Sequence, residues 1–178
     1  QAIRDKKVLN VTYRSYRKPA PEELVLGPYC LREFKKRWYL YAQKAEDAEP
    51  HMFALDRIQS IEIGKAKFVL PKKFNAHEYF AGIYGARVYP DMKRETVILK
   101  VSDTQAKYFK SLPLHKSQEI VEKDSEYTTF KYFLTPDYDF KQDVLSFGTS
   151  VEVLKPEHLR KEMGEIISKL NSKYNGMQ

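Results

Sequence analysis

The chain has 178 residues, of which 42% are hydrophobic and 31% charged, and its formal net charge is +7. This length is sufficient for one large domain or two small ones, and the hydrophobic content excludes a wholly disordered chain. The sequence has no apolar run of membrane-spanning length, no secretory signal and a single cysteine, Cys30, so we expect a cytoplasmic protein with no disulfide and no membrane partner.

Five short strands are predicted within residues 1–70. Each is rich in β-branched and aromatic residues and is bounded by turn residues or prolines. The chain starts at Gln1 and not at an initiator methionine, so it is expected to be a fragment or a processed product that begins with the end of a helix. The predicted strands cover residues 8–13, 23–34, 37–43, 51–55 and 58–63, with a bend near Gly27-Pro28. Their close spacing favours a small β-barrel or a strongly bent sheet.

The rest of the chain alternates strands and helices after a connector at residues 71–94. Strands are predicted at 96–101, 118–122, 127–134 and 150–154, and helices are predicted to begin near Asp103, Pro136 and Pro156. Pro113 and Gly148 are expected to end the first two helices. The order β-α-β-β-α-β plus a terminal helix is the split βαβ or ferredoxin-like pattern. We therefore predict an α+β fold with a barrel domain at 1–70 and an α/β domain at 95–178.

The net positive charge of the chain comes entirely from residues 1–94. Residues 1–94 carry 19 Lys and Arg against 11 Asp and Glu, whereas residues 95–178 carry 12 against 13. A basic surface beside aromatic side chains is typical of proteins that bind a polyanion. The alternative is an ordinary basic surface that favours solubility.

The predicted strands around Trp38 and Arg57 combine aromatic side chains with cations, which suits them to stack a base or bind an anion. Arg57 is the candidate anion ligand, and the alternative is an internal salt bridge with Asp56 or Glu33. Trp38 and Leu40 are expected in the core. Three tyrosines are candidates for stacking on a ligand, unless they pack in the core: Tyr13, Tyr39 and Tyr41. Cations from two loops would form a basic rim if the fold brings these loops together: Arg14, Arg17, Lys18, Lys35, Lys36 and Arg37.

No catalytic, metal or cofactor motif stands out. The four histidines are not at zinc-ligand spacing, and Gly82-Ile83-Tyr84-Gly85 lacks the features of a phosphate loop. We therefore expect a protein that is not an enzyme and holds no metal and no cofactor. A hydrolase would require catalytic groups that converge only in space.

The series of motifs along the chain resembles the WYL domain family. Trp38-Tyr39-Leu40 matches the signature that names the family, and Phe53-Ala54-Leu55-Asp56-Arg57-Ile58 follows in the expected order. The segment Val151–Leu154 with the residues after it resembles the C-terminal extension that often follows WYL domains. The resemblance covers nearly the whole chain.

This resemblance implies an Sm-like, SH3-type barrel and an extension that helps to form homodimers. It implies the effector-sensing region of a bacterial transcriptional regulator, with a DNA-binding winged helix before residue 1 and single-stranded nucleic acid as effector in some members. Tyr13, Tyr39 and Arg57 would line the pocket, with His51 nearby. Ala54 stands where members often have arginine, so ligand type stays open, and the alternative is a purely structural homodimerisation module.

Overall fold

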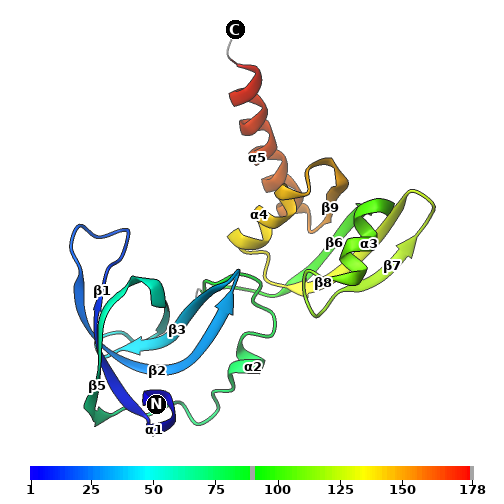
Figure 1. Ribbon diagram of the computed structural model, residues 1–178. Helices are drawn as coiled ribbons and strands as arrows, with labels where there is room; N and C mark the ends of the chain where they lie inside the picture. Colours follow the sequence, from blue (N-terminus) through cyan, green and yellow to red (C-terminus); the bar gives the residue numbers. More distant parts are fainter. Residues whose placement is uncertain (89–90, 177–178) are drawn as a thin grey trace. The chain divides into compact units, whose positions relative to one another are not determined.

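The computed structural model describes residues 1–88 and 91–176. These residues form two compact units, one of residues 1–81 and 86–88 and the other of residues 82–85 and 91–176. Each unit contains one antiparallel sheet, and the described residues include five α-helices, so the predicted α+β class is confirmed (Figure 1). None of the described helices is long and apolar enough to cross a membrane.

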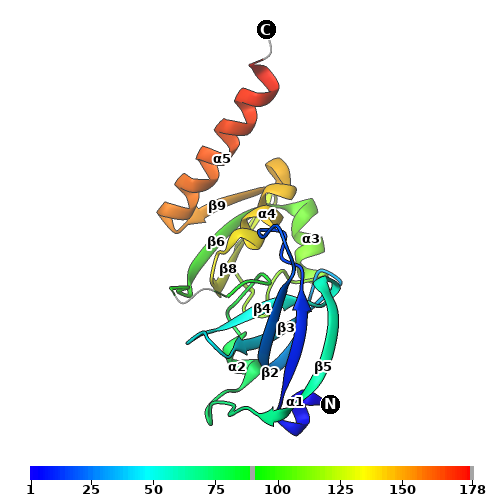
Figure 2. The ribbon, with the colours of Figure 1, turned by 90° about the vertical axis from the view of Figure 1, so that its left-hand side faces the viewer.

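The first unit contains a five-stranded sheet with the order β4-β3-β2-β1-β5. All five predicted strands are present, and β5 is longer than predicted. The hydrogen-bonded pairs of the described residues place β4 and β5 at opposite edges, so a closed barrel stays a prediction (Figure 2). The elements are α1 (Ala2–Asp5), β1 (Lys7–Tyr13), β2 (Glu22–Phe34), β3 (Arg37–Lys44), β4 (Pro50–Ala54), a 3-10 helix η1 (Leu55–Arg57), β5 (Ile58–Lys67) and α2 (Ala76–Tyr79).

Alternate residues of these strands form the core of the first unit. Cross-strand partners point to the same face of a sheet, and the register pairs Val11 with Leu24 and Leu40 with Phe53. These four side chains are almost completely buried, in a cluster that also contains Leu9, Tyr13, Leu26, Ala42 and Ala2. We call this face of the sheet the inner face. The predicted bend of β2 is observed as a shift of register between Pro28 and Cys30.

The outer face of β2 and β3 is covered by aromatic residues from the segment that follows β5. Tyr41, which is 1% exposed, packs against Phe74, Tyr79 and Phe80 with ring centroids 5.2–6.0 Å apart. Its hydroxyl donates a hydrogen bond to the Tyr79 hydroxyl at 2.6 Å. Tyr41 is therefore a packing residue of the outer face.

Trp38 is not a core residue, contrary to prediction. It lies opposite Glu33 near the end of the β2–β3 hairpin and is 49% exposed, whereas Leu40 is 3% exposed. Lys35 and Lys36 form the turn with φ angles of 48° and 62°. The alternation of the strand continues to the tip of the hairpin, but the core that would bury Trp38 does not extend that far.

The second unit has the predicted order of elements and a four-stranded sheet in the order β7-β8-β6-β9. All neighbouring strands are antiparallel, as in the split βαβ motif. The predicted helix stop at Gly148 is observed, since this residue follows α4 with a φ of 55°. The elements are β6 (Glu95–Ser102), α3 (Asp103–Ser111), β7 (Glu119–Lys123), β8 (Tyr127–Leu134), α4 (Tyr138–Ser146), η2 (Gly148–Ser150), β9 (Val151–Lys155) and α5 (Glu157–Asn175).

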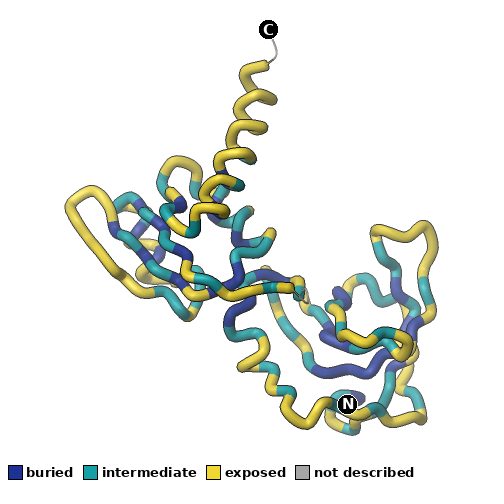
Figure 3. The backbone as a smooth tube through the Cα atoms, turned by 180° about the vertical axis from the view of Figure 1, so that it is seen from behind, coloured by how far each residue is buried: buried dark blue, intermediate teal, exposed yellow. Residues whose placement is uncertain are grey.

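The three longer helices pack on one face of this sheet through a single hydrophobic cluster. Phe109 of α3, Phe140 of α4 and Leu159 of α5 are at most 2% exposed and belong to one cluster with the buried residues of the central strands β6 and β8. The last 12 residues of α5 are different, because nearly all are exposed (Figure 3). They include Ile167, Leu170 and Tyr174, which are 54%, 43% and 84% exposed.

Candidate ligand-binding cavity

A cavity of about 380 Å³ lies at one end of the inner face in the first unit. The loop between β1 and β2, the end of β3, strand β4 and η1 all contribute to its wall. Six of the lining side chains are basic or can become so, and one is acidic. The lining residues are Tyr13, Ser15, Arg17, Lys18, Glu22, Leu24, Lys44, His51, Met52, Phe53, Arg57, Arg87 and Val88.

The apolar part of the lining belongs to the core cluster. The rings of Tyr13 and Phe53 pack edge to face with centroids 5.3 Å apart, and Leu24 lies beside them in the same cluster. The Tyr13 hydroxyl accepts a hydrogen bond from the backbone N–H of Ala54 at 3.3 Å. The base of the cavity is thus apolar and well packed. The basic side chains of the surrounding segments can contact a ligand that lies on this base.

The guanidinium of Arg57 uses only part of its hydrogen-bonding capacity. Its Nε atom is buried and has no hydrogen-bond partner among residues 1–88 and 91–176. The guanidinium carbon lies 4.0 Å from the centre of the Tyr16 ring, a cation–π contact that supplies no acceptor. The predicted alternative partner, Asp56, forms its ion pair with Arg37 at 3.5 Å. Because an unpaired buried donor destabilises a protein, an anion that accepts from Arg57 would be stabilised there.

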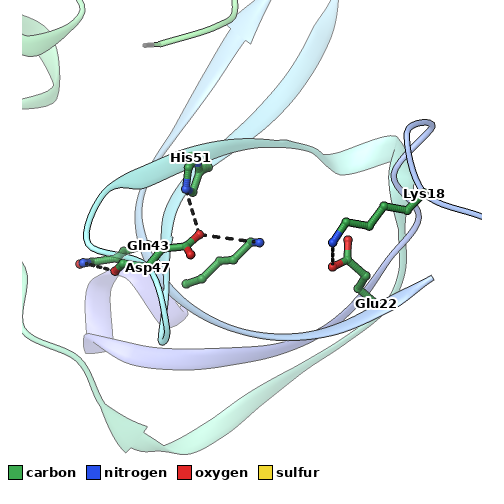
Figure 4. A network of polar contacts seen from close by, with 6 residues as sticks. Lys18, Glu22, Gln43, Asp47 and His51 are labelled. Atoms are coloured by element: carbon green, nitrogen blue, oxygen red, sulfur yellow. Dashed lines mark hydrogen bonds and ion pairs between the residues drawn. The ribbon is translucent and has the colours of Figure 1, made fainter. Parts of the chain in front are cut away.

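Three other basic groups of the cavity have internal partners (Figure 4). Lys18 pairs with Glu22 in the loop that precedes β2. His51 Nε2 lies 2.9 Å and Lys44 Nζ 3.7 Å from the same carboxylate oxygen of Asp47. These side chains are partly exposed, between 23% and 54%, so water and salt screen their attraction.

Three of the seven residues predicted from the sequence line the cavity: Tyr13, His51 and Arg57. Arg14 does not line it, but its backbone N–H donates to the Arg57 carbonyl at 2.9 Å, and its guanidinium donates to the Pro19 carbonyl at 2.6 Å. Arg14 therefore helps to position Arg57.

The other three predicted residues lie elsewhere. Arg37 is at the hairpin turn, and Tyr39, half-buried, lies opposite Ala54 in the β3–β4 register, outside the cavity lining. Tyr41 lines a separate cleft of about 470 Å³ on the outer face, with Tyr29 and Phe74. The predicted basic rim is formed only in part: Arg17 and Lys18 line the cavity, whereas Lys35, Lys36 and Arg37 do not.

Lys44 and Asp47 were missed as site residues. Lys44 continues the alternation of Leu40 and Ala42 along β3 and so points to the inner face, a signal that was present in the sequence. Asp47 lies in the loop between β3 and β4, and no periodicity indicates its contacts. Ala54 is 3% exposed and does not line the cavity. No group of three or more potential metal ligands occurs in the described part of the chain.

Comparisons with known proteins agree with the two-part architecture. The model of the WYL domain matches residues 1–63, and the model of the WCX domain matches residues 93–170. A search of curated proteins finds no match.

Two solved structures resemble the chain. A CRISPR Cas-related protein has 16% sequence identity and a TM-score of 0.52, covering 97% of this chain and 49% of that one. Proteasome accessory factor B/C (PafBC) of Arthrobacter aurescens has 22% identity and a TM-score of 0.38, covering 92% of this chain and 24% of that one. The chain thus spans at most about half the length of these proteins. The first likeness shows a shared fold.

With its WYL domain followed by a WCX domain, the chain belongs to the WYL domain family.

Proposed function

We propose that this chain is the effector-sensing and dimerisation region of a bacterial transcriptional regulator. In this proposal, residues 1–70 form an Sm-like barrel that binds an anionic effector, single-stranded nucleic acid, and residues 95–178 form the homodimer. The protein is cytoplasmic and not an enzyme. DNA is bound by a winged-helix domain that precedes residue 1 in the full protein. Effector binding changes the geometry of the dimer and thereby that of the DNA-binding domains.

The observation that carries the effector proposal is Arg57. Its buried Nε atom lacks a hydrogen-bond partner within the described residues and lies at a cavity whose lining is mainly basic. A phosphate group accepts two hydrogen bonds from one guanidinium, which matches this unused capacity. Tyr13 and Phe53 supply an apolar surface for the base or sugar of a nucleotide.

The test is titration of a fluorescein-labelled oligothymidine, followed by anisotropy at low ionic strength. We expect wild type to bind in a salt-dependent manner and Arg57→Ala to bind about tenfold or more weakly, because a charge-assisted hydrogen bond is lost. Arg37→Ala is the matched control, since it removes the same charge outside the cavity and should change affinity little. The absence of salt-dependent binding by wild type would refute the nucleic-acid proposal.

The dimerisation proposal rests on α5. Ile167, Leu170 and Tyr174 continue the stripe of the buried residues Leu159 and Met163, yet they are exposed. A second copy of this helix would cover them. Light scattering should give a dimer for wild type and a monomer for Leu170→Asp, while Asn171→Asp, which adds the same charge on a neighbouring exposed residue, should remain dimeric.

The second candidate function is a purely structural homodimerisation module, favoured by the same exposed stripe. It predicts a stable dimer that binds neither oligothymidine nor inorganic phosphate. The two proposals therefore differ in the titration and agree in the light scattering.

A further inference from the structure

Asp47 holds two basic groups of the cavity at once. One of its carboxylate oxygens lies 2.9 Å from His51 Nε2 and 3.7 Å from Lys44 Nζ (Figure 4). Both side chains line the cavity, whereas Asp47 itself belongs to the loop between β3 and β4. The carboxylate therefore occupies the position from which an oxygen of an anionic ligand would contact the same two groups.

The loop that carries Asp47 is also held from the outer face of the sheet. Gln43, the neighbour of Lys44 in β3, donates from Nε2 to the carbonyls of Asp47 and Ala48, both at 3.0 Å. Its Oε1 accepts from the Tyr29 hydroxyl at 2.8 Å. Neighbouring residues of a strand point to opposite faces, so the loop has one attachment on each side of the sheet.

We propose that Asp47 is an internal counter-ion that the anionic effector displaces from Lys44 and His51, which releases the β3–β4 loop on its cavity side. This inference rests on the proposed function, because it describes how the same cavity is regulated. Without effector, Asp47 neutralises the cavity and holds the loop in place. With effector, ligand oxygens replace the carboxylate, and of the two side-chain attachments only the one through Gln43 remains.

The partial exposure of the network makes this exchange feasible. The side chains of Lys44, Asp47 and His51 are 23%, 32% and 50% exposed, so their attraction is screened and a single carboxylate is a weak competitor. A nucleic-acid strand brings several phosphates, and its binding releases counterions, which favours it at low salt. Arg57 offers the first contact, because its Nε has no partner among the described residues.

The first test compares Asp47→Asn with Glu46→Gln in the oligothymidine titration. Glu46 is exposed, lies in the same loop and forms no ion pair within the described part of the chain, so its variant removes the same charge without releasing a cavity cation. We expect Asp47→Asn to bind about threefold to tenfold more tightly than Glu46→Gln. The slope of log K against log salt should become steeper by about 0.7, because one more cation contacts a phosphate.

A double-mutant cycle with Lys44→Met separates displacement from general electrostatics. If Asp47 acts by masking Lys44, most of the gain from Asp47→Asn should disappear in the Lys44→Met background. A gain that persists unchanged contradicts the proposal, and so does an equal effect of Asp47→Asn and Glu46→Gln.

Hydrogen exchange tests the same proposal on the wild-type protein, without any substitution. The Asp47 backbone N–H donates to the Lys44 carbonyl at 3.3 Å, and its hydrogen exchange reports whether the loop is held. Exchange at Asp47 should become faster when oligothymidine binds, and an unchanged or slower rate refutes the displacement while leaving the effector proposal intact. If neither wild type nor Asp47→Asn binds oligothymidine, the effector proposal fails and this inference fails with it.

Discussion

The guanidinium carbon of Arg57 lies 4.0 Å from the centre of the Tyr16 ring, and this contact joins η1 to the loop between β1 and β2. Tyr16 is 74% exposed, so its ring is held by Arg57 and not by the core. Arg14, in the same loop, donates its backbone N–H to the Arg57 carbonyl. The loop therefore fixes both the backbone and the side chain of the residue that we propose to bind the effector.

Removing the Tyr16 ring should weaken effector binding. Tyr16→Ala frees the Arg57 side chain, so we expect oligothymidine affinity to fall by about twofold to fivefold, the value of an exposed cation–π contact. Tyr16→Phe keeps the ring and should bind like wild type. If Tyr16→Phe binds as weakly as Tyr16→Ala, the hydroxyl and not the ring is the important group.

Gln43 should be required for the stability of the first unit. Gln43→Leu removes the acceptor of the buried Tyr29 hydroxyl and the donor to two loop carbonyls, so we expect a loss of about 1–3 kcal/mol in the free energy of unfolding. Urea denaturation measures the change. Gln59→Leu, at an exposed position of β5, is the control and should lie within about 0.5 kcal/mol of wild type.

The second unit should lose stability at alkaline pH. Burial raises the pKa of Tyr84 and of Tyr132 well above the ordinary value of 10, and for Tyr84 a hydrogen bond to Asp143 raises it further. Because the pKa is higher in the folded state than in the unfolded state, the stabilisation is complete below about pH 10 and is lost as the pH rises above it. Above about pH 10, each of the two tyrosines should lower the free energy of unfolding by about 1.4 kcal/mol per pH unit.

Urea denaturation between about pH 9 and about pH 11 measures this slope. In Tyr132→Phe the slope should be shallower by the contribution of one tyrosine. Near neutral pH, the same substitution should lower the free energy of unfolding by only about 1 kcal/mol, because it removes the hydrogen bond to Gln118. An unchanged slope in Tyr132→Phe would contradict the assignment to this residue.

Alanine substitutions at two glycines of the second unit should change its stability in opposite directions. A Cβ at Gly85 would lie 2.6 Å from Asp137 Oδ2, and Asp137 also caps α4 by accepting from the Phe140 N–H at 2.9 Å. We expect Gly85→Ala to destabilise the unit by about 1–3 kcal/mol. Gly164 lies within α5 with no atom near the added Cβ, so Gly164→Ala should stabilise the helix by about 0.5–1 kcal/mol. Thermal unfolding of both variants measures the contrast, and a stable Gly85→Ala would contradict it.

Hydrophobic periodicity and turn residues were enough to predict the strands and helices, because in both units the positions of these elements depend on local sequence signals. The helix stop at Gly148 and the strands around Val11 and Leu99 illustrate this. Trp38 was misjudged, and the packing of Tyr41 was left open, for a different reason. Alternation along β3 tells which residues share a face, but not where the core ends or which later segment covers the outer face.

The cavity could be predicted only in part for the same reason. Arg57 was recognised because an arginine in an otherwise apolar strand pair needs a partner or a cleft, and Tyr13 because the resemblance to the WYL domain family places it in the pocket. The contacts of Asp47 with Lys44 and His51 depend on the path of a loop, which leaves no periodic signal in the sequence.

Trp38 is the single tryptophan of the chain and lies half-exposed near the tip of the β2–β3 hairpin. Its indole emission therefore reports on this one place, without a background from other tryptophans. In the free chain the indole contacts water on one side, so its emission maximum should be red-shifted. Any domain or molecule that covers the hairpin tip should shift the maximum to shorter wavelength, which makes the signature residue of the family an intrinsic probe of its own surroundings.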